Sequence, residues 1–251
     1  MNEILNKTQK LNKKQLLTIV MLIFGSWWAI LYGSSFIWRN FKSDRTIYMT
    51  GFYLTAVALT YIIYLLVIPL ILKIKSIKDI CNFAGFNLRT RSIILSILFL
   101  LTTVFMLIIP GTLIENNAWL WNIQPPLVEE LLFRGIIPAL LCVKFKKVPS
   151  FIISVVLFAL IHIMGVGGIQ QLLVSTVFGI IFMLIVFQTK SIIPTIIFHY
   201  IVNSGNAISL VLSILIFICF EFILLSKYIY DRIKQKNNKK NTTTRSLEKN
   251  I

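Results

Sequence analysis

Residues Gln124–Arg134 read Q-P-P-L-V-E-E-L-L-F-R, which places two adjacent carboxylates and an arginine in an otherwise apolar stretch. Leucine, valine and phenylalanine surround the charged side chains of Glu129, Glu130 and Arg134. An ionisable side chain at membrane depth costs about 3 kcal/mol on insertion scales, so it indicates a functional site by default. The rest of the chain is therefore interpreted as a membrane scaffold for a small polar site.

The composition predicts a helical membrane protein. Of the 251 residues, 57% are hydrophobic, and the mean hydropathy is +0.83. Most of the long apolar runs can cross about 30 Å of hydrocarbon, and none alternates as the strands of a membrane barrel do. We expect an all-α, polytopic, multi-pass protein with about eight transmembrane helices, near residues 16–38, 47–72, 92–109, 126–143, 149–164, 170–188, 194–203 and 207–226.

The chain divides into four segments by composition. We expect an N-terminal tail at 1–15, three membrane helices within 16–110, a second membrane region at 111–226 and a basic, disordered tail at 227–251. The first apolar run is too long for a signal-peptide core, so we expect it to be retained as a span. The three cysteines have neither metal-ligand nor disulfide spacing: Cys81, Cys142 and Cys219.

The net charge of +16 indicates how the chain is oriented. Lysine and arginine flank the apolar runs without interleaved aromatic residues, so we expect no nucleic-acid partner. With eight spans and the N-terminus inside, most of the 25 basic residues lie inside, and Arg39, Lys42 and Arg45 are the exceptions in an outer link. We therefore expect a cell-membrane protein with both termini in the cytoplasm and its polar site in the outer half of the bilayer.

The chain's two histidines lie in apolar segments, each with a partner at helical spacing. Phe158 shares a helix face with His162, and His199 shares one with Asn203, whose amide could donate to an oxyanion. Alone, a membrane histidine could simply bond a neighbour, and Phe158 could simply pack. Three polar segments at a similar expected depth, however, predict a single site.

The two glutamates are expected to differ in role. Glu130 precedes Arg134 by four residues, the better orientation for a helical ion pair. Glu129 is rotated about 100° from Glu130 and lacks this partner, so we expect it to be the base that activates water. His162 and His199 could bind that water, polarise a carbonyl or, with Glu129, ligate a metal such as zinc. The residues leave metal-bound water and water activated by glutamate alone equally open.

The order, residue types and separations of these motifs resemble the signature of a protease family. Glu-Glu-x-x-x-Arg at 129–134, Phe-x-x-x-His at 158–162 and His-x-x-x-Asn at 199–203 are similar to the motifs of the CAAX-processing and bacteriocin-immunity intramembrane proteases, called CPBP or Abi proteins. The resemblance covers about residues 120–207. It implies a fold of about eight spans, with site residues on helices 4, 5 and 7, that cleaves peptide bonds near the membrane surface. Residues 111–226 would then be the catalytic region.

The resemblance also implies a role for each matching residue. Glu129 resembles the general base, and Glu130 and Arg134 resemble its supporting pair. His162 resembles a second catalytic or metal-binding group, and Phe158 packs beside the site. The groups that would hold water or stabilise an oxyanion are His199 and Asn203. Family members are often described as metalloproteases, and the implied substrate is a peptide or membrane protein.

Two other functions stay open at this point. A non-catalytic immunity protein would bind a bacteriocin or its receptor in the bilayer, although binding alone does not require these motifs. A transporter would use the carboxylates as proton relays, but no inverted repeat accompanies them. The bias toward lysine, asparagine and isoleucine indicates an AT-rich bacterium, in which prenylated substrates are not expected. Glu221, in the last expected span, is assigned a structural or gating role, and nothing in the sequence indicates the oligomeric state.

Overall fold

The structure, a computed structural model, is helical throughout the part of the chain that it describes. The described residues are 12–42, 44–71, 74, 76–108, 118–163, 168–204 and 207–248. Within them, side chains are not described at 45, 71, 106–108, 118–121 and 236–248. Lipid offers no partner for free backbone N–H and C=O groups, so helices are the expected form for these apolar runs. The all-α class is confirmed for these residues.

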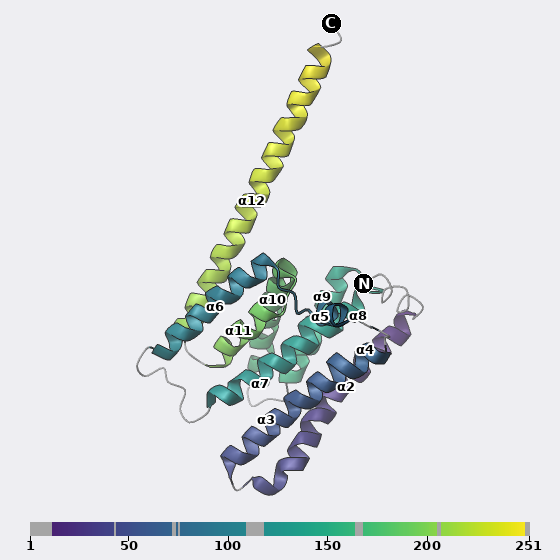
Figure 1. Cartoon of the computed structure of the whole chain (residues 1–251), viewed down its shortest axis with the longest axis vertical. Coiled ribbons are helices and arrows are strands. Elements are labelled where there is room, and N and C mark those ends of the chain that lie inside the picture. Colours follow the sequence, from purple (N-terminus) through teal and green to yellow (C-terminus); the bar gives the residue numbers. More distant parts are fainter. Residues whose placement is uncertain are drawn as a thin grey trace.

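Residues 13–71 form a hairpin of two long helices (Figure 1). Its elements are α2 (Lys13–Trp38), the 3-10 turn η1 (Arg39–Phe41), α3 (Arg45–Ile62), the π-helical turn η2 (Ile63–Val67) and α4 (Ile68–Ile71). Asn12 caps the start of α2 in a capping box: the Asn12 side chain accepts from the N–H of Gln15, and the Gln15 side chain accepts from the N–H of Asn12. The hairpin is therefore one packed unit, and α3 lies against α7.

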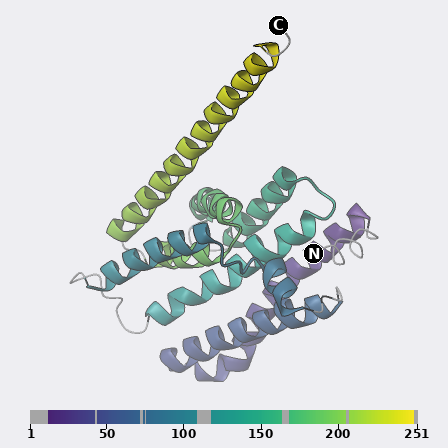
Figure 2. The same cartoon turned by 45° about the horizontal axis from the view of Figure 1, so that its top comes forward.

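The remaining helices carry the polar motifs. They are α5 (Ile77–Ala84), α6 (Thr90–Ile108), α7 (Ala118–Glu130), the π-helix η3 (Leu131–Ile136), α8 (Ile137–Leu141), α9 (Lys147–His162), α10 (Gly168–Thr189), α11 (Ile193–Asn203) and α12 (Ala207–Glu248). Among them α7 contacts α11, α11 also contacts α6, and α9 packs along α10. The helix α12 projects far beyond the bundle in both views (Figure 2). The motif-bearing helices are thus packed on one another inside the bundle.

Four of the described helices are long and apolar enough to cross a membrane: 13–41, 46–70, 168–189 and 207–235. Three shorter apolar helices cover 90–105, 147–162 and 193–203. The continuous run from α7 to α8 carries both glutamates and Arg134 at its centre. The chain is therefore a membrane protein by its helices, while the expected number of eight crossings stays a prediction.

The proline pair lies at a different place in its helix than expected. The sequence predicted a span that begins near residue 126, directly at the pair Pro125 and Pro126, but α7 begins at Ala118 and contains both prolines. Each proline lacks an N–H, so the pair removes two internal hydrogen bonds from the helix instead of marking its first turn. The helix continues through them into the segment that carries the glutamates.

Two further segments are more helical than expected. The basic connection 73–91 contains α5. Residues 227–248, expected to be disordered, continue α12 as helix. No glycine or proline occurs between residues 207 and 248, so no residue in this stretch breaks the helix. The expected disorder was based on polar composition alone. Composition does not show whether a helix that begins upstream continues through a segment.

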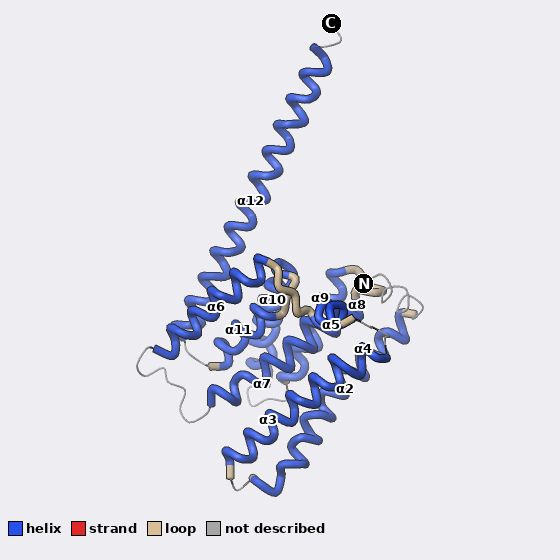
Figure 3. Tube along the Cα trace, in the orientation of Figure 1, coloured by secondary structure: helices blue, strands red, loops and turns tan. Residues whose placement is uncertain are grey.

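Two loops distant in sequence are bonded together directly before α11 (Figure 3). Gly85 ends α5 with φ +85°, and its carbonyl accepts from the N–H of Ile192 at 2.9 Å. The Asn87 side chain donates to the carbonyl of Lys190 at 2.8 Å. These bonds join the α5–α6 connection to the α10–α11 connection, and they fix the point at which α11 enters the bundle.

Candidate active site

The site is built on a π-helical segment in the middle of the bundle. Glu129 and Glu130 end α7, and η3 follows with all six residues buried. A single π-helical turn within an α-helix often marks a functional site. Gly135 lies in this turn, and a Cβ there would collide with the carbonyl of Ala84 at the end of α5. The close approach of α5 thereby fixes the segment that carries Arg134.

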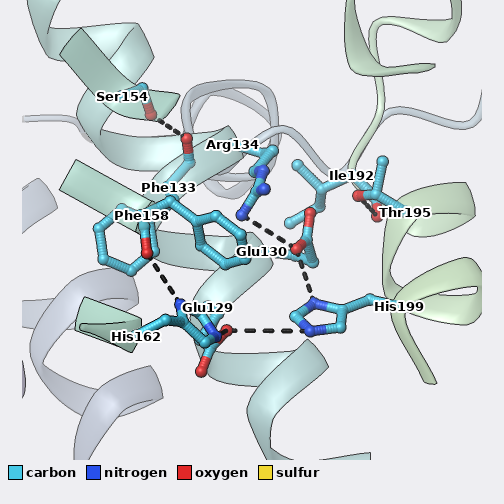
Figure 4. Close-up of polar contacts among 10 residues, drawn as sticks. All are labelled: Glu129, Glu130, Phe133, Arg134, Ser154, Phe158, His162, Ile192, Thr195 and His199. Atoms are coloured by element: carbon cyan, nitrogen blue, oxygen red, sulfur yellow. Dashed lines mark hydrogen bonds and ion pairs between the residues drawn. The ribbon is translucent and has the colours of Figure 1, made fainter. Parts of the chain in front are cut away.

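One oxygen of Glu130 binds both Arg134 and His199 (Figure 4). Arg134 Nη1 lies 3.1 Å from Glu130 Oε1, the pair that the spacing of four indicated, and both side chains are fully buried. His199 Nδ1 lies 2.9 Å from the same oxygen. Because a carboxylate only accepts, Nδ1–H must be the donor, and the neutral ring then has its lone pair on Nε2. Glu130 therefore sets the tautomer and the orientation of His199.

His162 is held in the same tautomer by the backbone. Its Nδ1 lies 2.9 Å from the carbonyl oxygen of Phe158, one turn earlier on α9. A carbonyl only accepts, so Nδ1–H donates and the neutral ring keeps its lone pair on Nε2. The spacing of four between Phe158 and His162 thus provides a backbone acceptor as well as a shared face.

The two free Nε2 atoms lie at equal distances from Glu129. His162 Nε2 and His199 Nε2 are each 3.9 Å from Glu129 Oε2. That distance is too long for a hydrogen bond and suits two groups bridged by one water. Oε2 of Glu129 is buried and has no hydrogen-bond partner among the described residues. A carboxylate and two ring nitrogens provide the several polar partners that a buried water requires.

Aromatic rings hold the charged groups in place. The Arg134 guanidinium lies 3.8 Å from the ring centroid of Phe158 and 5.1 Å from that of Phe182. Phe182 also stacks on the His199 ring, with centroids 4.9 Å apart and planes 30° apart. Phe158 therefore does more than pack beside the site. Phe182, on α10, lies outside the three motifs, and no spacing in the sequence distinguished it from other phenylalanines.

Thr195 and Ser154 are further residues that the sequence interpretation missed. Thr195 is fully buried one turn before His199, donates to the carbonyl of Ile192 at 2.7 Å and interacts with Glu130. Its spacing of four from His199 was the available signal. Ser154 donates to the carbonyl of Phe133, which ties α9 to η3. Such contacts depend on which helices are neighbours, which the sequence does not state.

Two of the polar residues singled out in the sequence lie apart from this cluster. Asn203 ends α11, one turn beyond His199, and no hydrogen bond between its side chain and the other site residues occurs in the described part of the chain. Glu221 lies on α12 and accepts from Gln188 at 3.2 Å. Glu221 therefore belongs to a separate contact between α10 and α12.

The side chains of Glu129, His162 and His199 are of the types that bind a divalent metal, but the distances between their donor atoms are longer than metal ligation requires. Each histidine donates its Nδ1–H to an oxygen, as metal-binding histidines usually do. Zinc bonds of about 2.0–2.1 Å put tetrahedral nitrogen and oxygen ligands about 3.4 Å apart, which is less than 3.9 Å. No group of three metal-binding side chains has a ready-made metal geometry in the residues described. A metal here would require the three groups to move closer together.

Comparison with known families gives one match. Residues 114–205 match the Rce1-like family model, whose description is "Type II CAAX prenyl endopeptidase Rce1-like". This stretch contains all three motifs, so the resemblance to the CPBP or Abi proteins is confirmed. No curated protein and no solved structure matches the chain.

Proposed function

We propose that this chain, which belongs through residues 114–205 to the Rce1-like family, is an intramembrane endopeptidase. Its substrate would be a membrane-associated peptide or protein. The family is one of proteases, and the apolar helices support a location in the membrane. The observation that carries the proposal is the convergence of the two histidine Nε2 atoms on Glu129 Oε2 at 3.9 Å each.

Glu129 is the proposed general base. A water held between Glu129 Oε2 and the two Nε2 atoms would give a proton to Glu129 as its oxygen attacks the peptide carbonyl carbon. The same proton would then pass from Glu129 to the leaving nitrogen as the C–N bond breaks. The products are a carboxylic acid and an amine, and Glu129 returns to its starting state.

Glu130 and Arg134 are proposed as a positioning pair rather than reacting groups. Glu130 accepts from His199 Nδ1–H and so directs Nε2 toward the water. Arg134 balances the charge of Glu130 inside an apolar site. Asn203, one turn beyond His199, is the proposed donor to the oxyanion that forms on the peptide carbonyl.

A divalent metal held by Glu129, His162 and His199 would polarise the bound water, and this stays the alternative way to activate it. The roles proposed for Glu130, Arg134 and Asn203 are the same in both cases. Orientation is part of the proposal too: both termini in the cytoplasm would place the site in the outer half of the membrane.

The proposal is tested by incubating the purified full-length protein in detergent with membrane-anchored peptide precursors. Products are identified by mass spectrometry. We expect wild type to release a defined fragment and Glu129→Gln to release none. If no form cleaves and Glu129→Gln still protects cells from a bacteriocin, the protein is a binding protein and the protease proposal is wrong.

A further inference from the structure

A cavity with basic and apolar lining residues lies beside the proposed active site and shares Arg134 with it. It has a volume of about 270 Å³ and is bounded by α5, η3, α8, α9 and α10. Among the described residues that line it are two lysines, two asparagines and a buried arginine, and none is acidic: Lys147, Lys190, Asn82, Asn87 and Arg134. Arg134 is paired with Glu130, whereas no carboxylate among the lining residues compensates the two lysines.

Two ammonium groups meet at the ring of Phe187 in this cavity. Lys190 Nζ lies 4.4 Å from the ring centroid, and Lys147 Nζ lies 5.8 Å from it. Partial burial, followed by the charges of Lys147, Arg89 and Arg91, lowers the pKa of Lys190. Like charges gathered in this way favour an anion between them.

The backbone of Lys190 adds an independent observation. Lys190 has φ +59°, and it is the one residue other than glycine with positive φ in the described chain. Glycine or asparagine adopts this conformation at lower cost. The Asn87 side chain bonds to the Lys190 carbonyl and holds the turn. A disfavoured backbone kept by neighbouring bonds points to a use for the lysine side chain.

Arg134 connects this cavity to the centre of the bundle. Arg134 is 3% exposed and also lines the cavity. Its Nη2 is buried without a hydrogen-bond partner among the described residues. Because Glu130 balances the charge of Arg134 at 3.1 Å, the excess positive charge of the cavity comes from the two lysines.

We propose that this cavity is an anion site that takes the phosphate group of an anionic phospholipid. The charges of Lys147, Arg89 and Arg91 act on Lys190, and basic pockets between membrane helices bind lipid headgroups. Apolar residues complete the lining and suit the glycerol and the start of the acyl chains: Phe151, Met183 and Val186. The assignment of this anion site does not depend on the proposed protease activity.

Cys142 provides a direct readout, because it lines the cavity and is exposed. The full-length protein in neutral detergent is treated with a maleimide while short-chain phosphatidylglycerol is titrated, and labelling of Cys142 is followed by mass spectrometry. We expect phosphatidylglycerol to slow the labelling of Cys142 and to leave the exposed Cys219 on α12 unaffected. Phosphatidylcholine of equal chain length should protect much less. Equal protection by both lipids would overturn the proposal.

A pair of double variants tests the lysines. Lys147→Gln with Lys190→Asn removes both charges and keeps a side chain that suits the turn. Lys146→Gln with Lys227→Gln removes two exposed charges that do not line the cavity. We expect the first pair to weaken the protection by about 30-fold and the second to leave it unchanged. Equal effects of the two pairs, or none in the first, would overturn the assignment.

Inorganic phosphate is the third arm of the experiment. If phosphate alone protects Cys142 and added phosphatidylglycerol gives no further protection, the site is assigned to free phosphate. That result would overturn the lipid assignment. Should the first double variant fail to fold, the comparison of the two lipids on the wild-type protein still decides the proposal.

Discussion

His199 Nδ1 donates to Glu130 Oε1 at 2.9 Å, and this bond joins α11 to the end of α7. The same oxygen contacts Arg134 at 3.1 Å. One carboxylate oxygen thus connects the charge of the arginine to the orientation of the histidine. The other ring nitrogen of His199 is left to face Glu129.

Breaking the buried Glu130–Arg134 pair should destabilise the protein. Glu130→Gln leaves Arg134 charged and buried without its partner, which costs about 3–5 kcal/mol. The double variant Glu130→Gln with Arg134→Met removes the unpaired guanidinium and should recover part of this loss. Neither should cleave at the wild-type rate, because His199 loses its charged acceptor. Thermal unfolding in detergent and cleavage assays measure the two effects, and a single variant as stable as wild type would contradict the expectation.

The ring of Phe182 should matter for the reaction. Phe182→Leu removes the surface that stacks on His199 and faces Arg134, and misplacement of a reacting group by about 1 Å can cost about 100-fold in rate. We expect kcat to fall by about 10- to 100-fold with little change in KM, and Phe182→Tyr to retain most of the rate. Phe178→Leu, one turn earlier on α10, is the matched control. A similar loss in both leucine variants would indicate a general packing defect.

Adding a methyl group at Gly135 should disturb the fold near the site. Gly135→Ala would place a Cβ against the carbonyl of Ala84, and such overpacking typically costs about 1–3 kcal/mol. Gly33→Ala is the control, because a Cβ there meets nothing within 4 Å. We expect a lower unfolding temperature for the first variant and an unchanged or slightly higher one for the second. Equal unfolding temperatures would show that α5 can shift to accommodate the methyl group without a loss of stability, and would contradict this expectation.

A chelator should leave cleavage largely intact. The separation of 3.9 Å between each Nε2 atom and Glu129 Oε2 is longer than the spacing of about 3.4 Å between ligands of a shared zinc ion. The measurement is the cleavage rate after prolonged dialysis against EDTA, with and without added zinc. Loss of activity that zinc restores would show that the three groups close around a metal.

The sequence predicted the central part of the site because helical spacing is local information. Glu130 with Arg134 and Phe158 with His162 each share a helix face through a spacing of four, and both pairs are in contact in the structure. Scarcity helped as well, because the chain has two histidines and both lie in apolar helices. These local features do not depend on how the helices are arranged.

The missed features depend on contacts between helices. Phe182 is one of 19 phenylalanines, and only the packing of α10 against α11 and η3 brings it onto His199 and Arg134. The bond between Gly85 and Ile192 joins two loops that no local pattern relates. The expected helix start near residue 126 was wrong for a different reason. Proline can also lie within a helix at the cost of internal hydrogen bonds, so the pair did not mark the first turn.

The central claim is that Glu129 is the base, and its most direct test is a single-turnover cleavage rate. Glu129→Gln keeps the size of the side chain and removes its basicity. Glu221→Gln makes the same change on α12, outside the site. We predict a loss of at least about 100-fold for Glu129→Gln and a near wild-type rate for Glu221→Gln, with both proteins folded by thermal unfolding. A folded Glu129→Gln protein that cleaves at the rate of Glu221→Gln would contradict the claim.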